Sequence, residues 1–271
     1  MKVVSTAAEL RSLGLEDVGF VPTMGALHKG HLSLVRAARQ EKKSVIVSIF
    51  VNPTQFGPNE DYSRYPRPLD QDLSLCLAEG VDAVFCPNPE EMYPLGTVSV
   101  NVRGISERWE GQFRPGHFSG VATVVAKLFI MVSPSAAYFG LKDFQQCAVV
   151  QALVRDMGFP IELRLMETVR ESDGLALSSR NTYLSPKSRE AAPQIYREIS
   201  FLAQQLRCHS GRQSELVNEA KLQLERSGFE VDYLVVVDGE TLEPTEFFVP
   251  GSRILVCARL DGVRLLDNVG F

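Results

Sequence analysis

The sequence contains no run of Lys and Arg, and its formal net charge is −5. Nucleic-acid binding depends on clustered basic side chains that neutralise phosphates, so we expect no nucleic-acid partner. No apolar run approaches the roughly 18 residues that a membrane helix needs. The first residues also lack the apolar core of a secretory signal. These absences predict a cytoplasmic protein with no membrane association.

Cysteine is scarce and unpaired: the five residues are widely spaced, and no Cys-x-x-Cys string occurs. This usage predicts reduced core residues rather than disulfides or a zinc site. The cysteines are Cys76, Cys86, Cys147, Cys208 and Cys257. Two phosphate-binding fingerprints, G-x-x-x-x-G-K-[ST] and G-x-G-x-x-G, are also missing. A nucleotide site in this chain must therefore be built differently.

The 271 residues are 45% hydrophobic and 23% charged, which is typical of a globular protein with more than one domain. Apolar, strand-like runs alternate with helical patterns over the first two thirds of the chain. The strand-like runs lie at residues 18–21, 44–51, 81–86, 136–139 and 161–167. The helical patterns lie at residues 31–41, 69–79, 119–132 and 144–157. This alternation predicts an α/β fold with a doubly wound, Rossmann-like parallel sheet.

The pattern changes after Asp173. Two helical stretches, 187–207 and 213–227, come before three strand-like runs. These runs lie at residues 231–237, 254–260 and 263–266, and Asp261 and Gly262 favour a tight hairpin turn between the last two. We therefore expect a first domain at 1–172 and a smaller α+β domain at 173–271.

The clearest local motif, PTMGALHKGH at residues 22–31, lies where the first strand gives way to the first helix. The start of a helix presents free N–H groups and the positive end of its dipole, which favours phosphates. We expect His28 and His31 to lie on one face of the first turn and to donate hydrogen bonds to one phosphate group. Gly25 and Gly30 would let the backbone approach the ligand. The alternative is a surface pair or a fortuitous metal pair.

Three further segments follow predicted strands. Residues 50–56 (FVNPTQF) offer the amides of Asn52 and Gln55, although an Asx turn before Pro53 would explain Asn52 equally well. Residues 140–146 (GLKDFQQ) offer Lys142 for phosphates, while Asp143 is suited either to a ribose hydroxyl or to capping the helix. Residues 177–181 (LSSRN) add two hydroxyls and Arg180, a residue that suits phosphate oxygens but is often simply solvated.

The order of these motifs resembles the HIGH-motif nucleotidyltransferases and, within them, the pantothenate synthetase family. The resemblance extends to about residue 185 and also includes RYPR at 64–67 and RPGHF at 114–118. It implies an AMP-forming carbon–nitrogen ligase that makes a coenzyme A precursor. Pantoate would attack ATP to give pantoyl adenylate and pyrophosphate, and β-alanine would then displace AMP. A homodimer is also implied.

The resemblance assigns roles by position. His31 would be a proton donor, with His28 beside it, and Lys142 and Arg180 would act on the phosphates. Gln55 and Gln146 would hold pantoate, and Gln55 would also contact β-alanine. Mg²⁺ would bridge phosphate oxygens, and Asp72 would help to place it. The implied ATP site comprises Met24, Gly25, Ala26, Leu27, His28, Lys29, Gly30, His31, Gly140, Leu141, Lys142, Asp143, Val169, Leu177, Ser178, Ser179 and Arg180.

One position departs from the family pattern: Leu141 stands where a Glu usually precedes the Lys-Asp pair. The change is tolerable if this position contacts the nucleotide through its backbone, but a lost ribose ligand would weaken ATP binding. Two alternatives remain. One is another HIGH-motif enzyme, such as a cytidylyltransferase, whose product retains the nucleotide. The other is a regulatory protein with a degenerate site. A tRNA synthetase is disfavoured because no basic domain follows residue 181.

Overall fold

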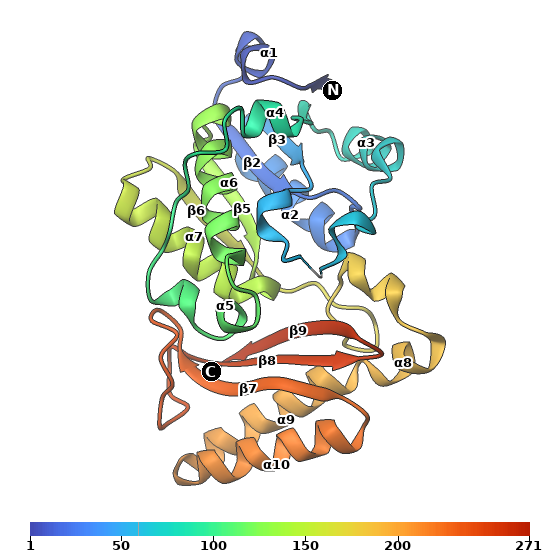
Figure 1. Ribbon diagram of the computed structural model, residues 1–271, viewed down its shortest axis with the longest axis vertical. Coiled ribbons are helices and arrows are strands. Elements are labelled where there is room, and N and C mark those ends of the chain that lie inside the picture. The colour runs from blue at the N-terminus through green and yellow to red at the C-terminus, as the bar shows by residue number, and fades with distance from the viewer. Residues whose placement is uncertain (59) are drawn as a thin grey trace.

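The computed structural model describes residues 1–58 and 60–271, and its larger part is built on a six-stranded sheet (Figure 1). All pairings in this sheet are parallel, in the order β1-β4-β3-β2-β5-β6. The strands are β1 (Lys2–Val4), β2 (Val18–Thr23), β3 (Ser44–Ile49), β4 (Ala83–Phe85), β5 (Ala136–Gly140) and β6 (Glu162–Met166). The predicted doubly wound sheet is confirmed.

Helices cover both faces of this sheet, which explains the continuous apolar runs of its central strands. Phe20 of β2 packs in one core cluster and Val21 in another, because successive side chains of a strand point to opposite faces. The first cluster includes residues of α1 (Ala7–Ser12), α6 (His117–Val132) and α7 (Phe144–Met157). The second includes residues of α2 (Lys29–Glu41) and α3 (Leu69–Ala78).

The strand order reverses between β2 and β5, which are neighbours although far apart in sequence. The chain leaves the carboxyl end of β2 toward α2. It leaves the carboxyl end of β5 through a short 3-10 helix, η4 (Leu141–Asp143), and enters α7. Ligands of open α/β sheets bind in the crevice at such a reversal. The fold therefore places the His28–His31 motif and the Lys142 motif at one crevice.

The C-terminal part is a three-stranded antiparallel sheet with helices on one face (Figure 1). Its elements are α8 (Pro186–Ala191), α9 (Gln194–Cys208), α10 (Gln213–Arg226), β7 (Glu230–Asp238), β8 (Ser252–Leu260) and β9 (Val263–Gly270). Ile254 and Val256 pack with α9 and α10, whereas Leu255 and Cys257 pack in a cluster that includes Ala148 of α7. The three-stranded sheet thus lies between its own helices, α9 and α10, and helix α7 of the larger part. The exact domain boundary at residue 172 stays a prediction.

Several local expectations can be compared directly with the structure. Asp261 and Gly262 both have positive φ angles, 51° and 75°, as the predicted hairpin turn requires. The single helix at 187–207 is wrong: α8 ends before Pro193, and α9 begins after it. The prediction also missed β1 and α1, although Thr6 and Glu9 form a capping box.

Between the strand-like run at 81–86 and the helical pattern at 119–132, the chain forms short helices: α4 (Pro89–Met92), η3 (Ile105–Glu107) and α5 (Glu110–Phe113). All five cysteines are free, but Cys208 is exposed, so its assignment to the core was wrong. Within the described parts of the chain, no helix is long and apolar enough to cross a membrane.

Candidate active site

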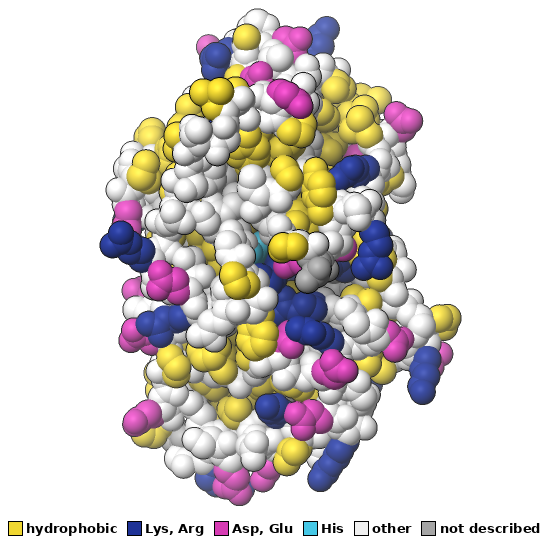
Figure 2. Space-filling model, viewed as in Figure 1, with side chains coloured by type: hydrophobic (Ala, Val, Ile, Leu, Met, Phe, Trp, Pro, Cys, Tyr) yellow, Lys and Arg dark blue, Asp and Glu magenta, His cyan; other side chains and the backbone are white. Residues whose placement is uncertain are grey.

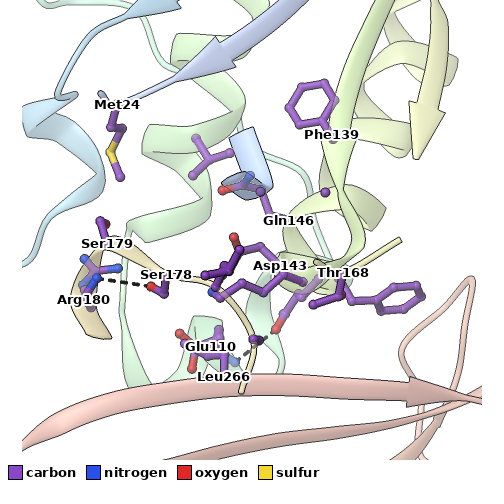
Figure 3. A pocket seen from close by; sticks show the side chains of 18 of the residues that line it. Met24, Glu110, Phe139, Asp143, Gln146, Thr168, Ser178, Ser179, Arg180 and Leu266 are labelled. Carbon is purple, nitrogen blue, oxygen red and sulfur yellow. Dashed lines mark hydrogen bonds and ion pairs between the residues drawn. The ribbon is translucent and has the colours of Figure 1, made fainter. Parts of the chain in front are cut away.

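A cavity of about 270 Å³ lies at the crevice and extends to the C-terminal sheet. Figure 2 shows basic side chains gathered beside this hollow, in which a His ring is visible. In Figure 3, Met24 and the segment with Ser178, Ser179 and Arg180 lie across from Asp143 and Gln146, with Leu266 of β9 beneath. The predicted residues that line the cavity are Met24, His28, Gly30, His31, Gln55, Gly140, Lys142, Asp143, Gln146, Val169, Leu177, Ser178, Ser179 and Arg180. Those that do not line it are Gly25, Ala26, Leu27, Lys29, Asp72 and Leu141.

The two histidines form the N-terminal cap of α2. His28 is the N-cap residue with extended backbone, so the expectation that both rings stand on the first helical turn is corrected. Its Nδ1 accepts the Gly30 N–H at 3.1 Å, and Nδ1 of His31 accepts the His28 N–H at 3.3 Å. The ring centroids are 4.1 Å apart. The pair thus satisfies helix N–H groups in the manner of a capping box.

This geometry fixes the protonation of both rings. Because each Nδ1 accepts an N–H, the proton of each neutral ring must be on Nε2. Burial, with Lys142 nearby, lowers the pKa of His28 to about 4. Burial and the neighbouring His28 lower the pKa of His31 to about 3. At neutral pH, the histidines of the unliganded site are therefore neutral donors whose Nε2–H groups remain free of the helix.

Gly30 makes room for this arrangement. A Cβ at this position would lie 2.9 Å from Cε1 of His28, so the glycine of the H-x-G-H string lets the His28 ring fold over the helix start. The structure thus gives a local steric reason for Gly30, while its role in backbone approach to a ligand stays a prediction. The spacing of the motif is needed to build the pair itself.

Asp72 holds the turn that comes before the histidines. Its Oδ2 accepts the Ala26 N–H at 2.8 Å, and its Oδ1 accepts the Leu27 N–H at 2.7 Å. Gly25 and Ala26 both have left-handed backbone, with φ of 81° and 50°, which is costly for Ala26. Burial raises the pKa of the Asp72 carboxyl, and the two N–H groups partly offset that shift. The Asp72 carboxylate, which does not line the cavity, thus stabilises the strained turn at Gly25 and Ala26.

Gln55 is oriented by a buried neighbour, Asn52. The Asn52 amide donates to Gln55 Oε1 at 3.0 Å, while its Oδ1 accepts the Thr54 N–H at 3.3 Å. The Asx turn at Asn52 is thus present, and Asn52 also lines the cavity. The Gln55 Nε2 approaches the Met24 sulfur at 3.1 Å. Both predicted substrate amides, Gln55 and Gln146, line the cavity.

A third histidine, the buried His117, supports the same loop. His117 Nε2 lies 3.0 Å from an Arg114 N–H donor, so Nε2 accepts and Nδ1–H donates to the Gln55 carbonyl at 2.8 Å. Burial and the Arg114 charge lower the pKa of His117 to about 4. Arg114 in turn makes a bidentate pair with Glu60. The RPGHF string was part of the resemblance, but its connection to Gln55 was not foreseen.

The Lys142 segment presents one cation and one carboxylate to the cavity. Lys142 Nζ lies 3.1 Å from Asp143 Oδ1, and the Asp143 side chain makes no capping hydrogen bond to α7. Capping therefore does not explain Asp143. The Leu141 side chain is buried and faces away from the cavity, while its carbonyl accepts a hydrogen bond from Asn268. Position 141 is thus held through its backbone.

Arg180 is a paired cation rather than a solvated one. Its guanidinium makes a bidentate pair with Asp61, with both N···O distances at 2.9 Å. Burial raises the pKa of Asp61, but the hydrogen bonds and charge of Arg180 outweigh it, and the pKa is lowered overall. Beside this pair, Tyr65 hydroxyl and Ser179 Oγ are 3.2 Å apart. Sequence reasoning missed Asp61, which lies near the RYPR string.

The metal prediction finds little support in this geometry. Both Asp72 oxygens accept backbone N–H groups, and Asp72 does not line the cavity. Among residues 1–58 and 60–271, no group of three or more His, Cys, Asp or Glu side chains could hold a metal ion. The residues present do not fit a Mg²⁺ site built on Asp72.

Comparison with known proteins decides the family. The family model described as Pantoate-beta-alanine ligase matches residues 2–270. A pantothenate synthetase of Thermus thermophilus is 52% identical over 273 residues, covering 99% of both chains. The chain belongs to the pantoate-β-alanine ligase family. The Moorella thermoacetica pantothenate synthetase is 48% identical and covers 97% of this chain and 93% of its own.

Solved structures of pantoate-β-alanine ligases show the same architecture. A Thermus thermophilus pantothenate synthetase superposes with a TM-score of 0.95 at 51% identity, covering 99% of each chain. The Francisella tularensis pantoate-β-alanine ligase superposes with a TM-score of 0.82 at 34% identity, covering 99% of this chain and 97% of its own. That protein is described as complexed with beta-gamma ATP and β-alanine. The resemblance stated from the motifs is confirmed, and a cytidylyltransferase is not favoured.

Proposed function

We propose that the protein joins pantoate to β-alanine at the expense of ATP through a pantoyl adenylate. In the first step, a pantoate carboxylate oxygen bonds to the α-phosphorus, and the bond from that phosphorus to pyrophosphate breaks. In the second step, the β-alanine amine bonds to the acyl carbon, its proton leaves, and AMP departs. The observation that carries the proposal is a single cavity whose lining includes the imidazoles of His28 and His31, the cations of Lys142 and Arg180, and the carboxamides of Gln55 and Gln146.

The histidine pair would act on the α-phosphate. Fixed Nε2–H groups of His28 and His31 donate without reorganising when charge develops on the phosphate oxygens, and such preorganised donors stabilise transition states strongly. Lys142 and Arg180 would supply the positive charge for the leaving pyrophosphate. Since both cations are paired with carboxylates in this structure, nucleotide binding would exchange part of that pairing for phosphate oxygens.

The carboxamides would hold the acid that is activated. Gln55 and Gln146 offer both donors and acceptors, which suit the hydroxyl and carboxylate groups of pantoate. Asn52 and His117 fix Gln55 from behind, so its orientation is set before substrate arrives. Gln55 would also contact β-alanine. Such positioning keeps the adenylate oriented toward the amine rather than toward water.

We further propose ATP contacts from the whole predicted set, with Gly25, Ala26, Leu27, Lys29 and Leu141 contributing through the backbone. Mg²⁺ would enter bound to the phosphate oxygens of ATP and keep several of its waters. Three proposals remain: a homodimer, which follows the family resemblance, and a cytoplasmic location and a domain boundary near residue 172, which follow the sequence patterns.

The direct test is product analysis with ATP, pantoate and β-alanine. The proposal predicts AMP and pantothenate in equal amounts, and isotope exchange between pyrophosphate and ATP that depends on pantoate. A product that retains the nucleotide would favour a cytidylyltransferase instead. Absence of AMP at saturating substrates would favour a nucleotide-binding regulator.

A further inference from the structure

The edge strand of the C-terminal sheet reaches the cavity with two successive buried residues, Asp267 and Asn268. Successive residues of a strand point to opposite faces. Asn268 faces the six-stranded sheet, whereas Asp267 contacts Arg170 close to α9. The two residues therefore contact two different loops of the site from one strand.

Asn268 holds the Lys142 segment. Its Nδ2 donates to the Leu141 carbonyl at 2.8 Å and to the Lys142 carbonyl at 3.0 Å. Its Oδ1 accepts from Arg253, whose guanidinium lies 4.2 Å from the centre of the Phe144 ring. The donor and acceptor groups of this amide are thus all used. The two carbonyls that it binds lie on either side of the Lys142 Cα atom.

Asp267 anchors the same strand to the segment that leads into Arg180. Its carboxylate, fully buried, makes a bidentate pair with Arg170 at 2.6 and 2.8 Å. Arg170 also donates to the Gly174 carbonyl at 3.2 Å and stacks on Tyr196 at 3.5 Å. Arg170 pairs with Ala176 in an antiparallel bridge, and next to it the Leu177 N–H donates to the Val169 carbonyl. Strand β9 is thereby fixed to the loop of Ser178, Ser179 and Arg180.

We propose that Asn268 is a positioning residue for adenylate formation, setting the location of Lys142 relative to Arg180 through the carbonyls of residues 141 and 142. The proposal rests on the function proposed above, because Lys142 and Arg180 are assigned there to the phosphates. On this proposal, Leu141 can stand where the family usually has Glu because the position is connected to the site by its carbonyl.

The test compares Asn268→Asp with wild type in pantoate-dependent exchange of pyrophosphate with ATP. The substitution preserves shape but replaces the donor of both bonds with an acceptor. A displacement of about 1 Å at a catalytic group costs on the order of 100-fold, so we expect the exchange rate to fall by about that factor. The KM for β-alanine should stay unchanged. Asn218→Asp, an exposed site on α10, is the control with the same change of charge.

A double-mutant cycle separates positioning from a general structural role. If Asn268 acts through Lys142, Asn268→Asp added to Lys142→Ala should lower the exchange rate by less than about threefold. An undiminished loss in the Lys142→Ala background would overturn the proposal, as would a normal exchange rate in Asn268→Asp. If Asn268→Asp does not fold, Asn268→Ala provides the same cycle without the added charge. Wild-type enzyme without pantoate-dependent exchange would refute the proposed function itself.

Discussion

The six-stranded sheet reaches the cavity through loops that follow its strands, whereas the three-stranded sheet reaches it with side chains along a strand. His28, His31 and Lys142 lie in contiguous motifs just after β2 and β5. Asn268 lies inside β9, and Arg264 of the same strand pairs with Glu110. On the proposed function, the loops that follow β2 and β5 would supply groups for chemistry, and β9 would fix where the Lys142 segment stands.

The largest expected effect is on turnover and comes from His28, in the loop that follows β2. Asn is a good N-cap residue, so His28→Asn should keep the acceptor for the Gly30 N–H while losing the Nε2–H donor. We expect kcat to fall by about 10²- to 10⁴-fold with the unfolding midpoint unchanged. Turnover assays and thermal unfolding check this. Near-normal turnover would refute the role of His28, and exposed His209→Asn is the matched control.

The next effect concerns the contact between the two regions. Arg264 makes a bidentate pair with buried Glu110 and also contacts Asp232. Arg264→Met would leave the buried Glu110 carboxylate with only two weaker contacts, the Tyr233 hydroxyl at 3.4 Å and an Arg114 nitrogen at 3.9 Å. Breaking a buried ion pair costs about 3 to 5 kcal/mol. Denaturant unfolding measures this loss. Arg259→Met, at a partly exposed arginine that also pairs with Asp232, should cost about 1 kcal/mol or less. Equal losses in both variants would contradict the account.

A smaller effect distinguishes two roles for Asp72. Asp72→Asn keeps one oxygen that can accept from Ala26 or Leu27. Its amide NH₂ group would face the second of these N–H groups, so that hydrogen bond is lost. Loss of about one charged hydrogen bond should raise the KM for ATP on the order of tenfold, with the Mg²⁺ requirement unchanged. Exposed Asp70→Asn is the control on the same helix. A shifted Mg²⁺ requirement with a normal KM for ATP would favour the metal role instead.

The smallest effect near neutral pH is on stability. Burial lowers the pKa of His28 and His117 to about 4 and of His31 to about 3. The unfolded chain therefore binds more protons than the folded chain below the usual histidine pKa of about 6.5, and stability falls as pH drops. From pH 6.5 to 5, the unfolding free energy of the wild type should decrease more steeply than that of His117→Asn. The difference between the two slopes should be up to about 1.4 kcal/mol per pH unit, which corresponds to one proton. Equal slopes would contradict the pKa of His117.

Sequence patterns predicted the first region well because strand and helix periodicity is local. The H-x-G-H string also marked a real cap, although its geometry depends on Gly30 clearing the His28 ring. The break between α8 and α9 was missed because the helical pattern continues across Pro193. The strings that contain His28, Gln55 and Lys142 were visible since each follows a strand directly.

The positioning residues could not be predicted in the same way. Each of them bonds to a segment far away in sequence. Asp61 pairs with Arg180, and Asp72 accepts the Ala26 and Leu27 N–H groups. Asn268 donates to the carbonyls of Leu141 and Lys142. A carboxylate that binds a metal and one that binds two backbone N–H groups look alike in a sequence. Only the folded chain distinguishes them, by showing which partners occupy their oxygens.

The most direct test of the account is the protonation of the histidine pair, measured by nitrogen NMR of the imidazole rings in unliganded protein at pH 7. The chain has only four histidines, so His28→Asn and His31→Asn variants suffice for assignment. The account predicts that His28 and His31 are neutral, with bare Nδ1 and protonated Nε2. Doubly protonated rings, or a proton on Nδ1 of either ring, would contradict it.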